Sequence, residues 1–333
     1  METTTSGTLA RQSEFRARRF LSGGHVQTIA SFLLPRRLDL PKSDQRLIEV
    51  EPGIHVLCHC HWQIDRRSPL TLIIVHGLEG STESNYMLGI AEKGLKAGMN
   101  VVRMNQRTCG GTDQLAPTLY HSGRSDDVMT VAKTLIENDQ ISRFALCGFS
   151  MGGNIVLKAA GEWGEHGPAE FCAVAAVCPA MDLAASADAL HLPENRIYEQ
   201  YFLWKLKARM RNKARCFPGT YDLNRLRGLK SLRDFDDKVT AFYTGFDGAA
   251  DYYARAAAAN VVDQIAVPAY ILYARNDPFI RVTAETRRKV ENNSNINFVE
   301  TEDGGHCAFI AAPDGYDGHF AERAVVEFCR SVV

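Results

Sequence analysis

Short apolar runs alternate with helical stretches from about residue 70 to the end of this chain. The runs are apolar on both alternating faces, which is typical of strands in a parallel sheet that helices cover on both sides. The stretches between most of them carry apolar residues at helical spacing. The runs are residues 72–75, 100–104, 143–147, 172–178, 269–273 and 296–299, and the clearest helical stretches are 126–138, 153–160 and 282–292.

An earlier segment, residues 46–62, predicts a pair of strands interrupted at Pro52-Gly53. Together with the six later runs, this pair predicts a mostly parallel, eight-stranded sheet flanked by helices, which is an α/β fold. Residues 1–19 are polar and predict a flexible leader.

One interval breaks the alternation of strands and helices. Residues 184–262 are helix-rich, aromatic and basic, and a structureless loop of that length is uncommon in a compact domain. We therefore expect a helical cap at 184–262, inserted over the carboxyl edge of a core formed by residues 20–183 and 263–333. Residues 196–215 carry many Lys and Arg side chains, which leaves two alternatives open: a solvated cap face, or a basic helix that contacts anionic membrane lipid.

The net charge of −1 provides no field that would recruit nucleic acid, so no nucleic-acid partner is expected. No stretch approaches the roughly 20 apolar residues of a membrane helix. The N-terminus lacks the apolar segment of a secretory signal. The nine cysteines are scattered and odd in number, which fits free thiols in a reducing compartment. These features predict a cytoplasmic protein.

The sequence Cys58-His59-Cys60-His61 resembles a metal site at first sight. Along a strand, however, alternation places both cysteines on one face and both histidines on the other. No second Cys/His pair lies at zinc-finger spacing. We expect neither a metal nor any other cofactor.

Gly148-Phe149-Ser150-Met151-Gly152-Gly153 follows an apolar run and opens a helical pattern. A G-x-S-x-G sequence between a strand and a helix predicts a nucleophile elbow, in which a strained turn presents the serine hydroxyl at the sheet edge. Both neighbours at −2 and +2 are glycine because the turn leaves no room for side chains. Ser150 is therefore the candidate nucleophile.

A serine hydroxyl needs a base that accepts its proton, and the base needs an orienting carboxylate. Asp277 directly follows the run 269–273, and His306 follows the run 296–299. Both therefore lie at the carboxyl ends of predicted strands, where open α/β sheets build their sites. We assign Asp277 as the acid and His306 as the base; Asn276 and Asp303 are the rival polar residues beside them.

Acyl transfer also needs donors for a developing oxyanion. One expected donor is the backbone N–H of Met151, which follows the nucleophile. The second is expected from His76-Gly77-Leu78-Glu79-Gly80, where the glycines allow close backbone approach, and we assign it to the N–H of Leu78.

From about residue 20 to its end, the chain resembles the YheT-type branch of the α/β-hydrolases. The branch includes bacterial predicted hydrolases, eukaryotic abhydrolase-domain proteins that act on acyl esters and phospholipid acyl chains, and yeast medium-chain acyl ethyl ester synthase/esterases. The residues that carry the resemblance are Gly24-His25-Val26-Gln27-Thr28, His76-Gly77-Leu78-Glu79-Gly80, Asn105-Gln106-Arg107-Thr108-Cys109-Gly110-Gly111, Tyr120-His121-Ser122-Gly123, and Ser150, Asp277 and His306 with their flanks.

The resemblance implies an α/β-hydrolase fold and an enzyme that cleaves small acyl esters. Thr108 departs from the pattern, because relatives usually carry Gly after the Arg. His121 and Asp126 also form an H-x-x-x-x-D pattern, which is sometimes tied to acyltransferases; the alternative is a structural His121 and an Asp126 that caps the next helix. His25 and Gln27 either line the mouth of the site or pin the N-terminal segment.

These observations predict a serine hydrolase for short- to medium-chain acyl esters that forms an acyl-enzyme on Ser150. Acyl transfer to an alcohol with the same three residues is the first alternative. A non-enzymatic binding scaffold is the second, and it predicts a degraded triad, whereas Ser150, Asp277 and His306 are all present.

Overall fold

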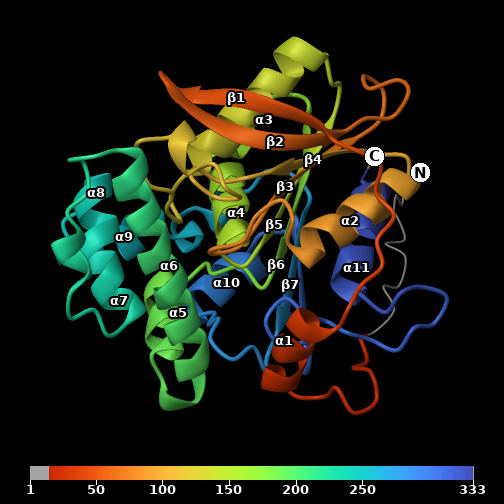
Figure 1. Ribbon diagram of the computed structural model, residues 1–333. Coiled ribbons are helices and arrows are strands. Elements are labelled where there is room, and N and C mark those ends of the chain that lie inside the picture. Colours follow the sequence, from red (N-terminus) through yellow and green to blue (C-terminus); the bar gives the residue numbers. More distant parts are fainter. Residues whose placement is uncertain (1–14, 333) are drawn as a thin grey trace, which may run out of the picture.

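A mixed eight-stranded sheet forms the centre of the molecule (Figure 1). The structure is a computed structural model and describes residues 15–332. The strand order is β1-β2-β4-β3-β5-β6-β7-β8. Strand β2 pairs antiparallel with β1 and β4, and all other neighbours are parallel. The strands are β1 (Asp44–Glu51), β2 (Ile54–His61), β3 (Thr71–Val75), β4 (Asn100–Met104), β5 (Phe144–Phe149), β6 (Phe171–Val177), β7 (Ala269–Ala274) and β8 (Ile296–Thr301).

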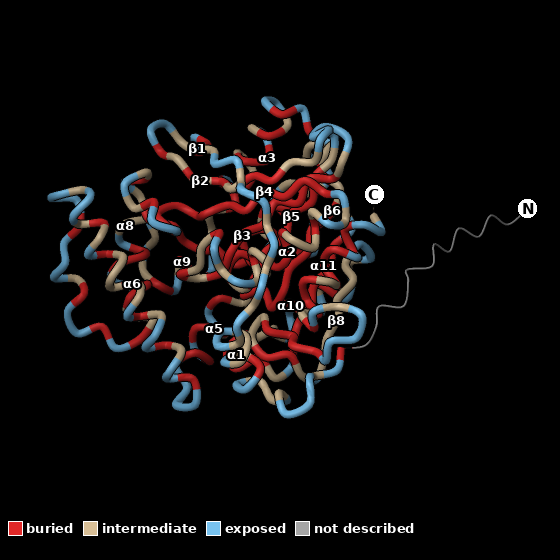
Figure 2. The backbone as a smooth tube through the Cα atoms, turned by 45° about the vertical axis from the view of Figure 1, so that its right-hand side comes forward, coloured by how far each residue is buried: buried red, intermediate tan, exposed pale blue. Residues whose placement is uncertain are grey.

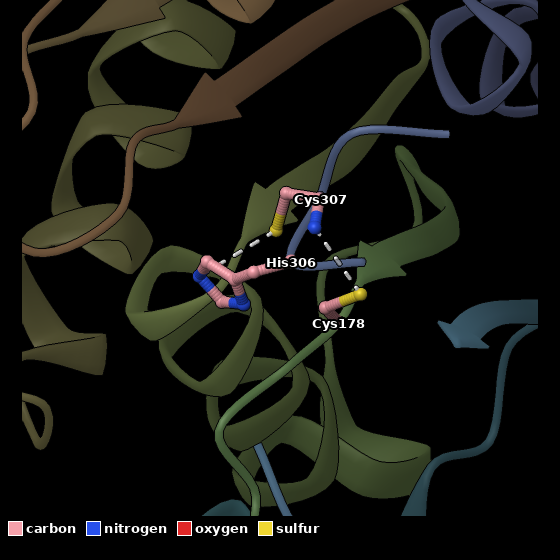
Figure 3. Close-up of side chains that lie close together, drawn as sticks. All are labelled: Cys178, His306 and Cys307. Carbon is pink, nitrogen blue, oxygen red and sulfur yellow. Dashed lines mark hydrogen bonds between the residues drawn. The ribbon is translucent and has the colours of Figure 1, made fainter. Parts of the chain in front are cut away.

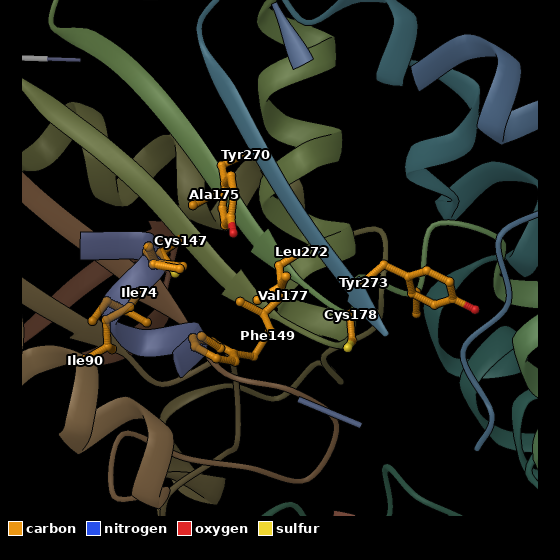
Figure 4. Packing of buried hydrophobic residues seen from close by; sticks show 14 of the residues in the cluster. Ile74, Ile90, Cys147, Phe149, Ala175, Val177, Cys178, Tyr270, Leu272 and Tyr273 are labelled. Carbon is orange, nitrogen blue, oxygen red and sulfur yellow. The ribbon is translucent and has the colours of Figure 1, made fainter. Parts of the chain in front are cut away.

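Helices cover both faces of this sheet. Helices α2 (Asn85–Lys96) and α11 (Phe320–Ser331) pack on one face, where Ile74, Cys147 and Leu272 contribute to the core (Figure 4). Helices α3 (Ser125–Asp139), α4 (Met151–Trp163) and α10 (Ala284–Asn292) pack on the other. Successive side chains of a strand point to opposite faces of the sheet and so enter one core or the other. The backbone of the central strands is therefore buried (Figure 2). The predicted continuous apolar runs are explained by this two-sided burial.

The chain between β6 and β7 is mainly helical and projects to one side of the sheet, in green to teal in Figure 1. Its helices are α5 (Leu183–Leu190), α6 (Arg196–Cys216), α7 (Leu232–Phe235), α8 (Phe242–Thr244) and α9 (Ala249–Ala256), with a π-helical segment from Asp236 to Ala241. A third apolar cluster, which includes Leu203, Leu206, Met210 and Val239, lies within this segment and also takes in Leu119 from the sheet side.

The expected α/β fold is confirmed. Each expected strand is present within two residues of its predicted bounds, and Gly53, at φ 74°, turns the chain between β1 and β2. The predicted leader needs a correction at its end. Residues 1–14 lie outside the described part, but Phe15 is buried between Phe309 and Phe320, and Ala17 forms a bridge with Ala311. The packed body therefore begins before residue 20, because an apolar ring at position 15 finds a partner on the C-terminal segment.

Candidate active site

Ser150 lies at the turn between β5 and α4, with φ 54° and ψ −119°. This left-handed φ is strained for a residue with a side chain. A Cβ on Gly148 would lie 2.2 Å from the carbonyl oxygen of Gly152, and one on Gly152 would lie 2.3 Å from that of Val75. The two glycines therefore allow the turn, and the hydroxyl stands at the N-terminus of α4, where negative charge is favoured.

Asp277 and His306 meet across the carboxyl ends of β7 and β8. The Nδ1 of His306 lies 2.8 Å from Oδ2 of Asp277. The other carboxylate oxygen, Oδ1, accepts hydrogen bonds from the backbone N–H groups of Phe279 and Ile280, at 3.0 and 2.9 Å. The carboxylate is fully buried, whereas 13% of the histidine side chain is exposed. This geometry orients the ring and directs Nε2 away from the carboxylate.

The rival Asp303, and Asp182 beyond the end of β6, accept hydrogen bonds from other groups. Asp303 accepts hydrogen bonds from the Asn276 side chain and from the backbone of Gly23 and Gly304. Asp182, the residue after Met181, instead accepts hydrogen bonds from the backbone and hydroxyl of Thr283, at the start of α10. None of the hydrogen bonds in residues 15–332 joins Asp182 or Asp303 to His306.

Helix α1 (Gly24–Leu33) holds the loop that carries His306, a contact that the sequence did not reveal. The hydroxyl of Thr28 accepts a hydrogen bond from the backbone N–H of His306 at 2.8 Å. The fully buried Gln27 side chain accepts from the N–H of Ile310 and donates to its carbonyl, at 2.7 and 3.0 Å. Gln27 therefore pins the N-terminal segment, and the signal that could have revealed Thr28 is the Gly-His-Val-Gln-Thr motif.

Ser150 opens onto a cavity between the sheet edge and the helices that follow β6. Leu78 and Met151, the residues assigned as oxyanion donors, line the same cavity. Among the hydrogen bonds of the described chain, none uses the N–H of Leu78 or Met151 as donor, so both groups are available to a ligand. The helical segment after β6 contributes apolar and aromatic lining residues together with a few polar ones such as Arg209 and Asp236; the apolar and aromatic residues include Leu190, Phe202, Leu206, Met210, Leu232, Phe235, Tyr252 and Tyr253.

A buried ion pair holds the loop directly after Leu78. Arg209 of α6 donates from Nε to one carboxylate oxygen of Glu79 at 2.6 Å and from an Nη atom to the other at 3.0 Å. The Tyr120 hydroxyl donates to the same carboxylate at 2.6 Å, and Lys205 donates to the Glu79 carbonyl at 2.9 Å. Glu79 itself has φ 54°. Helix α6 is thus bonded to the loop that presents the Leu78 N–H.

A family model described as the alpha/beta hydrolase fold matches residues 71–313 of this chain. The predicted esterase YheT of Escherichia coli (strain K12) is 31% identical over 314 residues, which cover 92% of this chain and 90% of that protein. The chain belongs to the YheT-like branch of the α/β-hydrolase family.

Two further comparisons are more distant. The medium-chain fatty acid ethyl ester synthase/esterase 2 of Saccharomyces cerevisiae is 24% identical over 290 residues, which cover 77% of this hydrolase and 61% of the yeast protein. The crystal structure of the Pyrococcus furiosus esterase Pf2001 has a TM-score of 0.55 at 20% identity, with 89% of this chain and 97% of that chain covered. At that identity the structural match shows the fold alone.

Thr108, where the resemblance led us to expect Gly, has φ 66° in this hydrolase. A left-handed φ favours glycine, which explains why relatives usually carry Gly at the position of Thr108. The carbonyl of Thr108 accepts a hydrogen bond from Arg209, and the preceding Arg107 is fully buried, with Asp127 and Glu51 as partners. The loop therefore keeps its turn despite the threonine.

The H-x-x-x-x-D pair is separated in the structure. His121 is buried, lines the cavity and packs edge-on against Phe246 and Tyr252. Burial, with nearby cations, lowers the pKa of His121 to about 3, so the ring is neutral. Asp126 is exposed in the first turn of α3, where the helix dipole stabilises a carboxylate. His25, by contrast, is exposed and hydrogen-bonds the Tyr198 hydroxyl at 3.0 Å.

The basic residues of α6 are mostly engaged with the protein. Lys207 donates to the carbonyl of Leu229, and the fully buried Lys213 donates to those of Asp113 and Ala116. With Lys205 and Arg209 on the Glu79 loop, four cations of the helix are used internally. Neither alternative from the sequence, a solvated face or a lipid contact, anticipated these bonds; the lipid contact stays a prediction.

The Cys58-His59-Cys60-His61 strand behaves as its alternation predicts. Both cysteines are buried in the core, while His59 contacts the Ser43 hydroxyl at 3.0 Å. Separately, no helix in residues 15–332 combines the length and apolarity needed to cross a membrane.

Two cysteines, Cys178 and Cys307, lie beside His306 (Figure 3). The Sγ of Cys307 is 3.9 Å from Nε2 of His306, and the Sγ of Cys178 accepts from the backbone N–H of Cys307 at 3.5 Å. Burial alone would lower the pKa of His306, but Cys307 and Asp277 raise it well above 6.5. No hydrogen bond of the described residues joins Nε2 to the Ser150 hydroxyl in this state of the site.

Proposed function

We propose that this protein is a serine carboxylic-ester hydrolase that acts through an acyl-enzyme on Ser150. One observation carries the proposal: the strained Ser150 turn faces a cavity whose wall also contains Leu78 and Met151. A nucleophile and two free backbone donors on one cavity are the arrangement that acyl transfer requires. The Asp277–His306 pair at 2.8 Å supplies an oriented base at the same sheet edge.

The proposed reaction has two steps. The Oγ of Ser150 attacks the acyl carbonyl while Nε2 of His306 accepts its proton, and the N–H groups of Leu78 and Met151 bind the oxyanion. His306 then protonates the departing alcohol. A water then attacks the acyl carbon while it gives its proton to the same nitrogen, and His306 returns that proton to Oγ as the acyl–Oγ bond breaks, which releases the acid and restores Ser150. Catalytic hydrogen bonds often tighten only when substrate is bound, so we expect Nε2 to turn from Cys307 toward Ser150 in the complex.

We propose that the helical segment at 184–262 selects short- to medium-chain acyl groups. Its side chains form most of the apolar cavity wall opposite Ser150, and each buried CH₂ contributes about 0.8 kcal/mol. Phe202 lines the cavity, whereas Trp204 is 64% exposed on the same helix. Phe202→Ala should therefore change the ratio of kcat/KM between long and short esters, and Trp204→Ala is the matched control that should leave it flat.

Transfer of the acyl group to an alcohol is the second candidate. It uses the same three residues, and the name of the yeast relative includes ester synthesis as well as hydrolysis. Turnover of an activated ester in graded ethanol separates the two reactions. A synthase forms ethyl ester at the expense of free acid, whereas a hydrolase forms free acid at an unchanged rate.

The proposed function is tested with p-nitrophenyl esters of increasing acyl length and a fluorophosphonate probe. We expect turnover of short to medium esters, and labelling at Ser150 that mass spectrometry locates. A wild-type protein that cleaves none of the esters and takes up no probe would refute the proposal.

A further inference from the structure

Three potential metal ligands converge next to the proposed nucleophile. Cys178 follows β6, while His306 and Cys307 lie on the loop after β8. One ligand atom from each of the three side chains lies within 4.8 Å of the other two. Within residues 15–332, no other set of three or more His, Cys, Asp or Glu side chains converges in this way. Figure 3 shows His306 and Cys307 on one loop and Cys178 on the neighbouring segment, with its sulfur toward the backbone nitrogen of Cys307.

One ligand pair has nearly the spacing of a tetrahedral zinc site, and all three ligand atoms lie within 4.8 Å of one another. With Zn–S of about 2.3 Å and Zn–N of about 2.05 Å, a sulfur and a nitrogen ligand lie about 3.6 Å apart, and two sulfurs about 3.8 Å apart. The observed separation of Cys307 Sγ and His306 Nε2 is 3.9 Å. This pair needs a shift of a few tenths of an ångström, and the other two pairs, which lie within 4.8 Å, need at most about 1 Å.

The second coordination shell is also present. A zinc-bound histidine commonly donates its other ring N–H to a carboxylate, which fixes the tautomer and leaves the remaining lone pair for the metal. Here Nδ1 of His306 is 2.8 Å from Asp277, so Nε2 is the nitrogen left to bind. The carboxylate pairing that prepares a catalytic base therefore also prepares a zinc ligand.

The backbone and the thiol contacts point the same way. Both cysteines have a left-handed φ, 43° at Cys178 and 59° at Cys307. Such strain at non-glycine residues gathers at functional sites. The Cys178 sulfur contacts the Gly305 carbonyl at 3.6 Å and accepts from the Cys307 N–H at 3.5 Å, while the Cys307 sulfur contacts the Val177 carbonyl at 3.4 Å. A thiol is a weak hydrogen-bonding group, so metal coordination would replace weak contacts.

We propose that Zn²⁺ binds to Cys178, His306 and Cys307 and thereby inhibits the hydrolase. Two thiolates and one imidazole are a ligand set that suits zinc, and a water completes four-coordination. The bound metal occupies the Nε2 lone pair, so His306 no longer accepts a proton from Ser150. The ion is an inhibitory ligand and takes no part in the reaction. The inhibition, though not the binding, rests on the proposed function.

Binding is measured on metal-free, reduced protein with Co²⁺ as a spectroscopic substitute and by calorimetric titration with Zn²⁺. We expect one equivalent of Co²⁺ to produce a thiolate-to-metal charge-transfer band that Zn²⁺ abolishes. Asp277→Asn should weaken zinc binding by about 10–100-fold, as for other second-shell partners. Cys307→Ser and Cys178→Ser should each weaken it at least as much. Cys172→Ser, on β6, is the matched control and should bind normally.

Ser150→Ala separates this proposal from the proposed function. The variant keeps all three ligands, so it should bind zinc as the wild type does although it cannot form an acyl-enzyme. In the wild type, zinc should lower ester turnover reversibly, with recovery on addition of EDTA. Absence of the cobalt band, or zinc binding that survives both cysteine substitutions, would overturn the proposal. So would inactivation that dithiothreitol reverses and EDTA does not, since that result indicates a disulfide between the two cysteines.

Discussion

Replacement of Arg209 by methionine tests whether α6 holds the loop of Leu78, the proposed oxyanion donor. Arg209 and Glu79 form a bidentate pair whose side chains are 13% and 3% exposed. Methionine keeps much of the apolar stem but removes both bonds to the carboxylate and the bond to the Thr108 carbonyl. Only the neutral Tyr120 hydroxyl would remain as a side-chain donor to the carboxylate.

The expected loss follows from the charge left behind. Removal of one partner from a buried ion pair typically costs about 3–5 kcal/mol, because the other charge stays in a low-dielectric site. We expect Arg209→Met to lose about that much unfolding free energy. Glu79→Gln in the same chain removes the stranded charge, so the double variant should recover part of the loss, with a coupling energy of about 1–3 kcal/mol.

Urea unfolding of the four proteins in the cycle measures these differences, and ester kinetics show the effect on the site. Loss of one oxyanion donor typically lowers kcat by about 10²–10³-fold. A loosened Leu78 should approach that range, with less change in KM. Arg211, exposed on the same helix, provides the control substitution Arg211→Met. A loss under about 1 kcal/mol together with wild-type kcat in Arg209→Met would refute the reasoning.

Three further substitutions address the reaction itself. Ser150→Ala should lower kcat by several orders of magnitude with the fold intact, and near wild-type ester turnover would remove Ser150 from the mechanism. Asp277→Asn should retain substrate binding but lose most turnover; a loss below about tenfold would show that another group orients His306. Cys307→Ser should move the acid limb of the kcat/KM profile to lower pH. Cys307 raises the pKa of His306, and His306 must be deprotonated to act as the base. Without Cys307, His306 should therefore lose its proton at a lower pH. An unmoved limb would mean that the thiol does not influence the base.

The local sequence pattern was sufficient to predict most strands and helices and the candidate site residues at the ends of the strands. A parallel strand buried on both faces must be apolar throughout, so β3, β5, β6 and β7 stood out without any knowledge of their neighbours. The turn at Ser150 was equally visible, since its geometry excludes side chains at Gly148 and Gly152. Asp277 and His306 followed because the carboxyl ends of parallel strands share one edge.

Contacts between distant segments were decided only by the tertiary structure. Thr28 supports His306 across 278 residues, and Arg209 reaches Glu79 across 130. Local periodicity predicts that a charged residue on a helix is exposed to solvent. Whether it is instead buried against a partner loop depends on the tertiary packing. Cys178 and Cys307 likewise gave no spacing signal, because they follow β6 and β8, which β7 separates in the sheet, and only the path of the loop after β8 brings them into contact. Side-chain partners at such separations depend on how the layers pack, which local sequence does not encode.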